Sequence, residues 1–187
     1  DPLAVAVHAA RQAGVGPGKS VLVLGAGTVG LCALQTALAW GAHRVCCTDV
    51  SDFCLALARE AGAALALRAD TPGLVHALCD RGLYDCVLDS VGSAETFSLG
   101  LAALKNRGAY VSLVADPAVQ LPFTLAALSG EKRISISANN TYDDYAEGIR
   151  LMAAGHILAG RMVTHTLPLD RVHEGLALME GKAGGAK

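Results

Sequence analysis

Three glycines stand at spacings that could hold a phosphate-containing ligand. Gly25, Gly27 and Gly30 form a Gly-x-Gly-x-x-Gly run. Gly25 allows a tight turn, Gly27 lets the backbone come close to a pyrophosphate, and Gly30 lets a helix lie close on the preceding strand. The unpaired amides and partial positive charge of that helix N-terminus favour an anion. The run therefore predicts a pyrophosphate site.

An acidic residue follows at the distance that completes a dinucleotide site. Asp49 lies about 20 positions beyond the third glycine, where a carboxylate accepts hydrogen bonds from adenosine ribose hydroxyls. It would repel a 2′-phosphate, and residues 50–54 offer no Arg to hold one. We therefore expect NAD rather than NADP. An ordinary glycine turn and a methyltransferase-like nucleotide site are the alternatives.

The apolar pattern around these residues predicts the elements that position them. Short β-branched runs alternate with helix-like stretches, as in βαβ units. Strands are expected over 20–24, 44–49, 64–67, 84–88, 109–114 and 133–137. Helices are expected over 2–14, 31–40, 51–62, 71–81, 93–104, 142–154 and 170–181, with a helical turn at 124–128. The predicted fold class is α/β, a doubly wound parallel six-stranded sheet (Rossmann fold) with extra flanking helices.

Further candidate cofactor-binding residues follow from this topology, because ligands lie outside the carboxyl ends of the strands. They are Thr28 and Val29 in the glycine run, Val50 after the acid, and Ser90, Val91 and Val114 at the next strand ends. Residues at the strand ends could equally serve only to turn the chain. No residue is assigned a catalytic or a metal-binding role.

Charge and hydropathy exclude several classes of partner. The 187 residues are 52% hydrophobic with a formal net charge of -2, which gives no cationic surface for nucleic acid or an anionic membrane. Charged residues such as Arg44, Asp49 and Arg59 keep apolar runs below the roughly 20 residues of a membrane span. The first residues lack the features of a secretory signal, which favours a cytoplasmic location.

Other polar residues are interpreted as structural. The cysteines lie in apolar segments without Cys-x-x-Cys spacing and are expected to be buried free thiols: Cys32, Cys46, Cys47, Cys54, Cys79 and Cys86. None of the six histidines has a partner at metal-binding spacing. Asp143 and Asp144 are expected to be acids of a helix N-terminus. Asn139, Asn140 and Tyr142 either reach a substrate or form a turn.

With these residues in hand, the chain resembles the medium-chain dehydrogenase/reductase family, most closely its zinc-dependent sorbitol and polyol dehydrogenases. The resemblance rests on the Asp-Pro-Leu-Ala-Val start, on residues 21–30 and 48–51, and on Val-Thr-His-Thr-Leu-Pro-Leu at 163–169. It implies a parent enzyme in which zinc polarises an alcohol oxygen and NAD takes the hydride. Two residues depart from the family pattern: Asp1 replaces a Glu, and Cys54 stands where relatives often place an Arg.

The resemblance also implies an organisation. Residues 1–17 would be a linking helix from a catalytic domain outside this sequence, 18–154 the NAD-binding domain, and 155–187 a segment that re-enters the catalytic domain. Zinc is expected only in the intact parent, whose partners would be NAD(H), a small alcohol or polyol, and further copies of itself. The fragment alone would be inactive, with self-association or partial disorder at its apolar flanks. A zinc-free quinone-reductase-like enzyme and a non-catalytic nucleotide- or S-adenosylmethionine-binding module are the alternatives.

Overall fold

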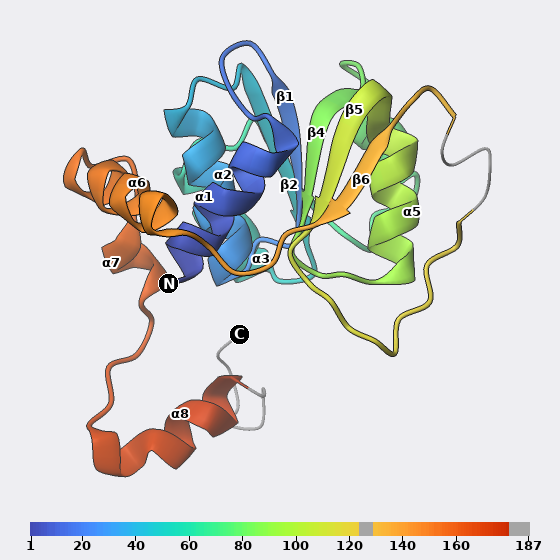
Figure 1. Cartoon of the computed structure of the whole chain (residues 1–187). Helices are drawn as coiled ribbons and strands as arrows, with labels where there is room; N and C mark the ends of the chain where they lie inside the picture. The colour runs from blue at the N-terminus through green and yellow to red at the C-terminus, as the bar shows by residue number, and fades with distance from the viewer. Residues whose placement is uncertain (124–128, 180–187) are drawn as a thin grey trace. The chain divides into compact units, whose positions relative to one another are not determined.

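A computed structural model describes residues 1–123 and 129–179, and its centre is one parallel sheet. Six strands lie in the order β3-β2-β1-β4-β5-β6. Figure 1 shows β1 between β2 and β4, with β5 and β6 beyond β4. They are β1 Ser20–Leu24, β2 Arg44–Asp49, β3 Leu65–Arg68, β4 Tyr84–Asp89, β5 Leu104–Ser112 and β6 Arg133–Ile136. The predicted doubly wound α/β fold with a parallel six-stranded sheet is confirmed.

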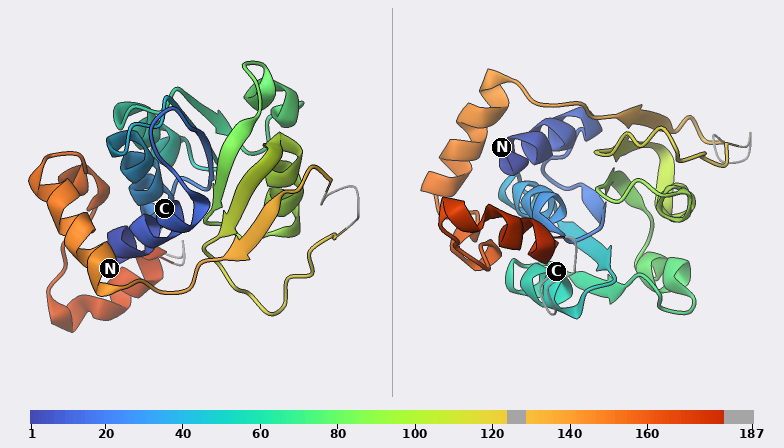
Figure 2. Two further views of the ribbon diagram at one scale, coloured as in Figure 1. Left: turned by 45° about the horizontal axis from the view of Figure 1, so that its top comes forward. Right: turned by 90° about the horizontal axis from the view of Figure 1, so that it is seen from below.

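Helices cover both faces of the sheet. They are α1 Pro2–Ala13, α2 Thr28–Ala39, α3 Asp52–Glu60, α4 Leu74–Cys79, α5 Ala94–Ala103, α6 Tyr142–Ala153, α7 Ala159–Met162 and α8 Val172–Met179, with a 3-10 turn η1 at Leu169–Arg171. Helices α1, α2 and α3 lie on one face and α4 and α5 on the other, and α6 packs on α1 (Figure 2). No helix in the described ranges is long and apolar enough to cross a membrane.

The chain divides into two compact units. Asp1–Ile157 contains the sheet with α1 to α6, and Leu158–Lys187 contains α7, η1 and α8. The domain limits expected from the sequence, 1–17, 18–154 and 155–187, stay predictions.

The core lies on both faces of the central strand, and β1 is buried along its whole length. Leu22 and Leu24 belong to a cluster with Phe97 of α5 and Tyr110 of β5. The rings of Phe97 and Tyr110 meet edge to face, with centroids 5.2 Å apart. Burial on both faces explains why β1 reads as a continuous apolar run instead of an alternating one.

The residues that cap the helices agree with the sequence signals, whereas the lengths of some helices differ from those expected. Gly14 ends α1 in the left-handed conformation with φ 72°, and the Ser51 hydroxyl caps α3 by accepting from the Cys54 amide. Helix α2 starts at Thr28, three residues before the expected start. Helix α4 spans only Leu74–Cys79, and it starts later than expected because Gly73 before it takes φ 69°.

Strand β5 differs most from the expectation. It starts at Leu104 instead of 109 and ends at Ser112 instead of 114. Arg107 takes φ 61°, and the pairing with β4 shifts register between Tyr84 and Cys86. This bulge carries the strand through Gly108, which lies between the helix and the strand expected from the sequence. The short helix α7 was not expected, and the predicted helical turn at 124–128 lies outside the described residues.

Candidate functional site

The glycine run forms the turn between β1 and α2. Gly25 takes φ 85°, and its amide donates to the carbonyl of Thr48 at 2.9 Å. A Cβ on Gly30 would lie 1.9 Å from the Gly25 carbonyl oxygen, so α2 can approach the turn only with glycine at position 30. A Cβ on Gly27 would meet no atom within 4 Å. Space above Gly27 is therefore open to a ligand that approaches the backbone.

The N-terminus of α2 opens onto the same space. No side chain caps the helix at Gly27, and the Leu31 amide closes the first helical hydrogen bond onto the Gly27 carbonyl at 2.8 Å. Amides at Thr28, Val29 and Gly30 precede that bond and have no carbonyl acceptor within the helix. Together with the partial positive charge of the helix end, they make a place where a phosphate is favoured.

Asp49 ends β2 and is tied directly to this turn. One carboxylate oxygen accepts from the Ala26 amide at 2.6 Å, and the other accepts from the Ser51 amide at 2.8 Å. Each oxygen of a carboxylate can accept more than one hydrogen bond, so both retain capacity for ligand hydroxyls. Val50 beside it is 62% exposed. The arrangement offers an acceptor for a diol next to an apolar surface.

The end of β4 closes the other side of the turn. The Ser90 hydroxyl lies 3.0 Å from the Leu24 carbonyl oxygen and 3.2 Å from that of Gly25, and it can donate to either. A Cβ on Gly25 would meet Val91 at 2.8 Å, and one on Gly92 would lie 2.6 Å from the Cβ of Val114. Ser90 and Val91 therefore lie beside the glycine turn, and Val114 lies beside Gly92.

Sequence reasoning missed the carboxylate that holds these strand ends in place. Asp89 is fully buried, and one of its oxygens accepts from the amides of Val91 and Gly92 at 2.9 and 3.0 Å. The other accepts from the Thr96 hydroxyl at 2.7 Å and from the hydroxyl of Tyr110. Burial and the nearby carboxylate raise the pKa of Tyr110. An acid that ends an otherwise apolar strand was the available signal.

All ten residues proposed from the sequence lie at one edge of the sheet. They are at the carboxyl ends of β1, β2 and β4, just beyond β5, or in the first turn of α2: Gly25, Gly27, Thr28, Val29, Gly30, Asp49, Val50, Ser90, Val91 and Val114. Strand order reverses between β1 and β4, and in open α/β sheets ligands bind at this point.

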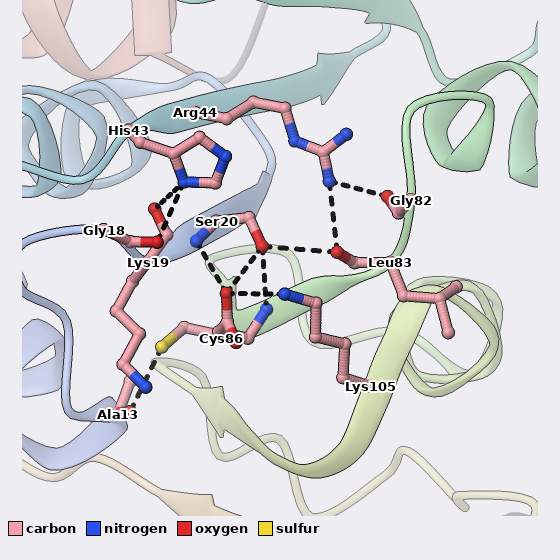
Figure 3. Close-up of polar contacts among 11 residues, drawn as sticks. Ala13, Gly18, Lys19, Ser20, His43, Arg44, Gly82, Leu83, Cys86 and Lys105 are labelled. Carbon is pink, nitrogen blue, oxygen red and sulfur yellow. Dashed lines mark hydrogen bonds and ion pairs between the residues drawn. The ribbon is translucent and has the colours of Figure 1, made fainter.

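Polar residues at the opposite edge of the sheet, where the strands begin, form hydrogen bonds and an ion pair with one another. The carboxylate of Asp85 accepts from the amide and hydroxyl of Ser20 at 2.8 and 2.7 Å and from Lys105 at 2.9 Å. Burial opposes its charge, but these contacts lower the pKa of Asp85 to about 2. Figure 3 shows Ser20 and Lys105 side by side, with Arg44 donating to the carbonyls of Gly82 and Leu83. These contacts fasten β1, β2, β4 and β5 together.

The cysteines and Asp144 have structural surroundings. All six cysteines are free thiols, as expected, but Cys54 and Cys79 are only half-buried. Burial raises the pKa of Cys32 to about 11 and of Cys47 to about 12. Thiols with such pKa values stay protonated and unreactive near neutral pH. Asp144 lies in the first turn of α6, as expected, and contacts His8 of α1 at 2.8 Å.

The residues after β6 are part of the chain's own contacts. Asn139 takes φ 59°, and both the Asn140 amide and the Tyr145 hydroxyl donate to the carboxylate of Asp1, at 3.3 and 2.7 Å. Tyr142 is 86% exposed. Asp1 is thus held against the start of α6.

The strand order and the helices on both faces define a Rossmann-type α/β domain. Residues 28–154 match the family described as zinc-binding dehydrogenase, and the chain belongs to that family. Within it, this chain is the part that corresponds to the cofactor-binding domain of a zinc-dependent medium-chain dehydrogenase. The family resemblance expected from the sequence is confirmed.

Individual relatives agree with this assignment. Sorbitol dehydrogenase of Bombyx mori is 30% identical over 195 residues, which cover 99% of this chain and 54% of that protein. L-idonate 5-dehydrogenase (NAD(P)(+)) of Escherichia coli strain K12 is 28% identical over 188 residues, 100% of this chain and 54% of that protein. The structure of alcohol dehydrogenase TADH from Thermus sp. ATN1 superposes with a TM-score of 0.89 at 31% identity, covering 97% of this chain and 54% of that one. The chain spans about half the length of the curated relatives it matches.

Zinc cannot be assigned to the described part of the chain. Within residues 1–123 and 129–179, no three His, Cys, Asp or Glu side chains gather in a way that could hold a metal ion.

Proposed function

We propose that this chain binds NAD(H) and is the cofactor-binding half of a zinc-dependent alcohol or polyol dehydrogenase. One observation carries the proposal: the Asp49 carboxylate accepts from the Ala26 amide inside the glycine turn. A ribose-binding acid and a pyrophosphate-binding turn are thereby joined in one site. Gly27 and Gly30 fit the cofactor because one leaves open space and the other allows the close approach of α2.

Each part of NAD has a place in this arrangement. The pyrophosphate would lie on the amides of Gly27, Thr28 and Val29, and the adenosine ribose on Asp49, with Val50 offering an apolar surface beside it. Ser90, Val91 and Val114 would lie toward the nicotinamide. When bound, NAD supplies the hydride acceptor for an alcohol carbon. The chain's own residues bind and orient the cofactor, and we assign no proton transfer to them.

Cofactor choice is a second part of the proposal. The name of the related L-idonate 5-dehydrogenase covers both NAD and NADP, so homology alone does not select one. Asp49 favours NAD, because a carboxylate beside the ribose repels a 2′-phosphate. We further propose a small polyol as substrate, in line with relatives named for sorbitol and idonate. We also propose that the parent is homo-oligomeric and cytoplasmic, as expected from the sequence.

Calorimetric titration of the 187-residue chain with NADH and with NADPH tests the proposal. NADH should bind more tightly than NADPH. Asp49→Ala should lower the affinity for NADH at least about tenfold, which is the effect of losing a hydrogen bond to a charged group. Because Asp49 also accepts from two backbone amides, Asp49→Asn and thermal unfolding accompany it to verify the fold. Glu131→Gln is the control, since Glu131 pairs only with exposed Arg107 among the contacts described.

Two outcomes would remove the proposal. Failure of NADH to bind the folded chain would leave only the fold assignment. Displacement of bound NADH by S-adenosylmethionine would instead favour a methyltransferase-like nucleotide site.

A further inference from the structure

The strand next to Asp49 ends in an arginine. Arg68 is the last residue of β3, and its Cα pairs with that of Asp49 at the end of β2. The Ala69 amide continues this pairing by donating to the Asp49 carbonyl at 2.9 Å. Paired residues on neighbouring strands project to the same side of a sheet. Arg68 therefore starts beside the proposed ribose-binding carboxylate, although 19 positions separate the two in the sequence.

Two aspartates hold the guanidinium of Arg68. Asp70 takes a two-pronged pair of bonds from Nε and Nη2, both at 2.9 Å, and Asp52 accepts from Nη1 at 3.1 Å. Asp52 is the first residue of α3, directly after Ser51, whose amide donates to Asp49. The guanidinium and the Asp49 carboxylate thus both reach the start of α3. Hydrogen bonding in this group raises the pKa of Arg68 and lowers that of Asp70.

The charges of this group oppose a 2′-phosphate. Asp49, Asp52 and Asp70 carry three negative charges against the one positive charge of Arg68, and a phosphomonoester adds about -1.5 to -2. A guanidinium without such partners is well shaped for two-pronged phosphate binding. The side chains of Arg68, Asp52 and Asp70 are 41%, 80% and 62% exposed, so their ion pairs are weak and can be exchanged for a ligand.

We propose that Arg68 is a cofactor-specificity residue, a latent 2′-phosphate-binding group that Asp52 and Asp70 keep occupied. Preference for NAD over the 2′-phosphorylated dinucleotide is then set by this pair of acids as well as by Asp49. The inference rests on the proposed function, because it requires the adenosine ribose to lie at the end of β2.

The test removes the two acids while leaving Asp49 in place. Asp52→Asn with Asp70→Asn in the full chain is titrated with NADPH and NADH at about 0.05 M salt, where screening is weak. NADPH affinity should rise about tenfold, as for one charge-assisted hydrogen bond gained, and NADH affinity should change less than about twofold. Adding Arg68→Gln to the double variant should return NADPH affinity to its starting value. Thermal unfolding verifies that every variant is folded.

A matched control separates local from general charge effects. The control variant, Asp80→Asn with Glu131→Gln, also removes two negative charges. These charges lie near the starts of β4 and β6, at the opposite edge of the sheet. An equal gain in NADPH affinity in this control would overturn the proposal. A gain in NADPH affinity that persists when Arg68→Gln is added to the double variant would also overturn it. An unchanged NADPH affinity with normal NADH binding overturns the role of Arg68 alone. If no variant binds either dinucleotide, the proposed function itself fails.

Discussion

Gly27 and Gly30 stand in the same turn but meet different surroundings. A Cβ on Gly30 would lie 1.9 Å from a backbone oxygen, whereas one on Gly27 would meet nothing within 4 Å. Gly27 takes φ -67° and ψ -170°, which any residue can adopt. The fold therefore requires glycine at position 30, and only a ligand would require it at position 27.

Two alanine substitutions turn this contrast into a prediction. Gly30→Ala should cost about 1–3 kcal/mol of unfolding free energy, because the turn and helix α2 must move apart. Gly27→Ala should leave stability unchanged within about 1 kcal/mol. It should lower the affinity for NADH at least about tenfold, because the methyl group of the new alanine occupies the approach to the backbone. Urea unfolding and calorimetric titration measure the two effects. Normal NADH binding by Gly27→Ala would show that the pyrophosphate does not lie over this residue.

Residues were predictable where their role depends on sequence spacing. The three glycines and Asp49 could be found because a strand, a tight turn and a helix of ordinary length fix their separation. Asp89 was missed because its partners include Tyr110, on a strand that follows it only after a helix. Arg68 was missed because its position beside Asp49 comes from strand pairing, whereas sequence spacing places a phosphate-binding Arg directly after the acid, at residues 50–54.

Helices α1 and α6 are joined by one buried carboxylate. Asp144 accepts from His8 at 2.8 Å and Arg11 at 3.1 Å on α1, and from the amide and hydroxyl of Thr141 at 2.8 and 2.7 Å. Burial opposes its charge, but the hydrogen bonds from Thr141 and His8 outweigh burial and lower the pKa of Asp144 to about 2. The charged carboxylate therefore stabilises the docking of the two helices.

The direction of this pKa shift predicts an acid-sensitive contact. A depressed pKa contributes stability above the ordinary value of 3.8, and this contribution is lost as pH falls toward about 2. The shift corresponds to about 2 kcal/mol. Asp144→Asn should lower stability at pH 7 and flatten its dependence on pH between 4 and 2, as measured by urea unfolding. The exposed neighbour provides the control, Asp143→Asn, and an equal flattening there would refute the role of Asp144.

Element boundaries were predictable where a local motif sets them. The Ser51 side chain begins α3, and the backbone freedom of Gly14 ends α1. Both residues are visible in the sequence. The predicted start of β5 was wrong because Arg107 takes a positive φ and the strand bulges against β4. A bulge depends on the partner strand, so residues 104–108 alone could not reveal it.

At the scale of the whole molecule, core and candidate site belong to one unit. Every buried residue in the described ranges lies in Asp1–Ile157, and so do all ten candidate cofactor-binding residues. In the second unit, α7, η1 and the described part of α8 contain no buried residue. Folding and cofactor binding should therefore depend on the first unit.

A chain that ends at Ile157 tests this division. It should unfold cooperatively and bind NADH within about twofold of the full chain, a difference of about 0.4 kcal/mol, because its sheet, core and glycine turn are complete. Circular dichroism and calorimetric titration measure both properties. The contrasting deletion removes residues 1–15, which takes away the buried Ala6, Val7 and Ala10 of α1; it should abolish the cooperative transition, because α1 covers β4, β5 and α2. Loss of NADH binding on removing only Leu158–Lys187 would instead place part of the cofactor site in the second unit.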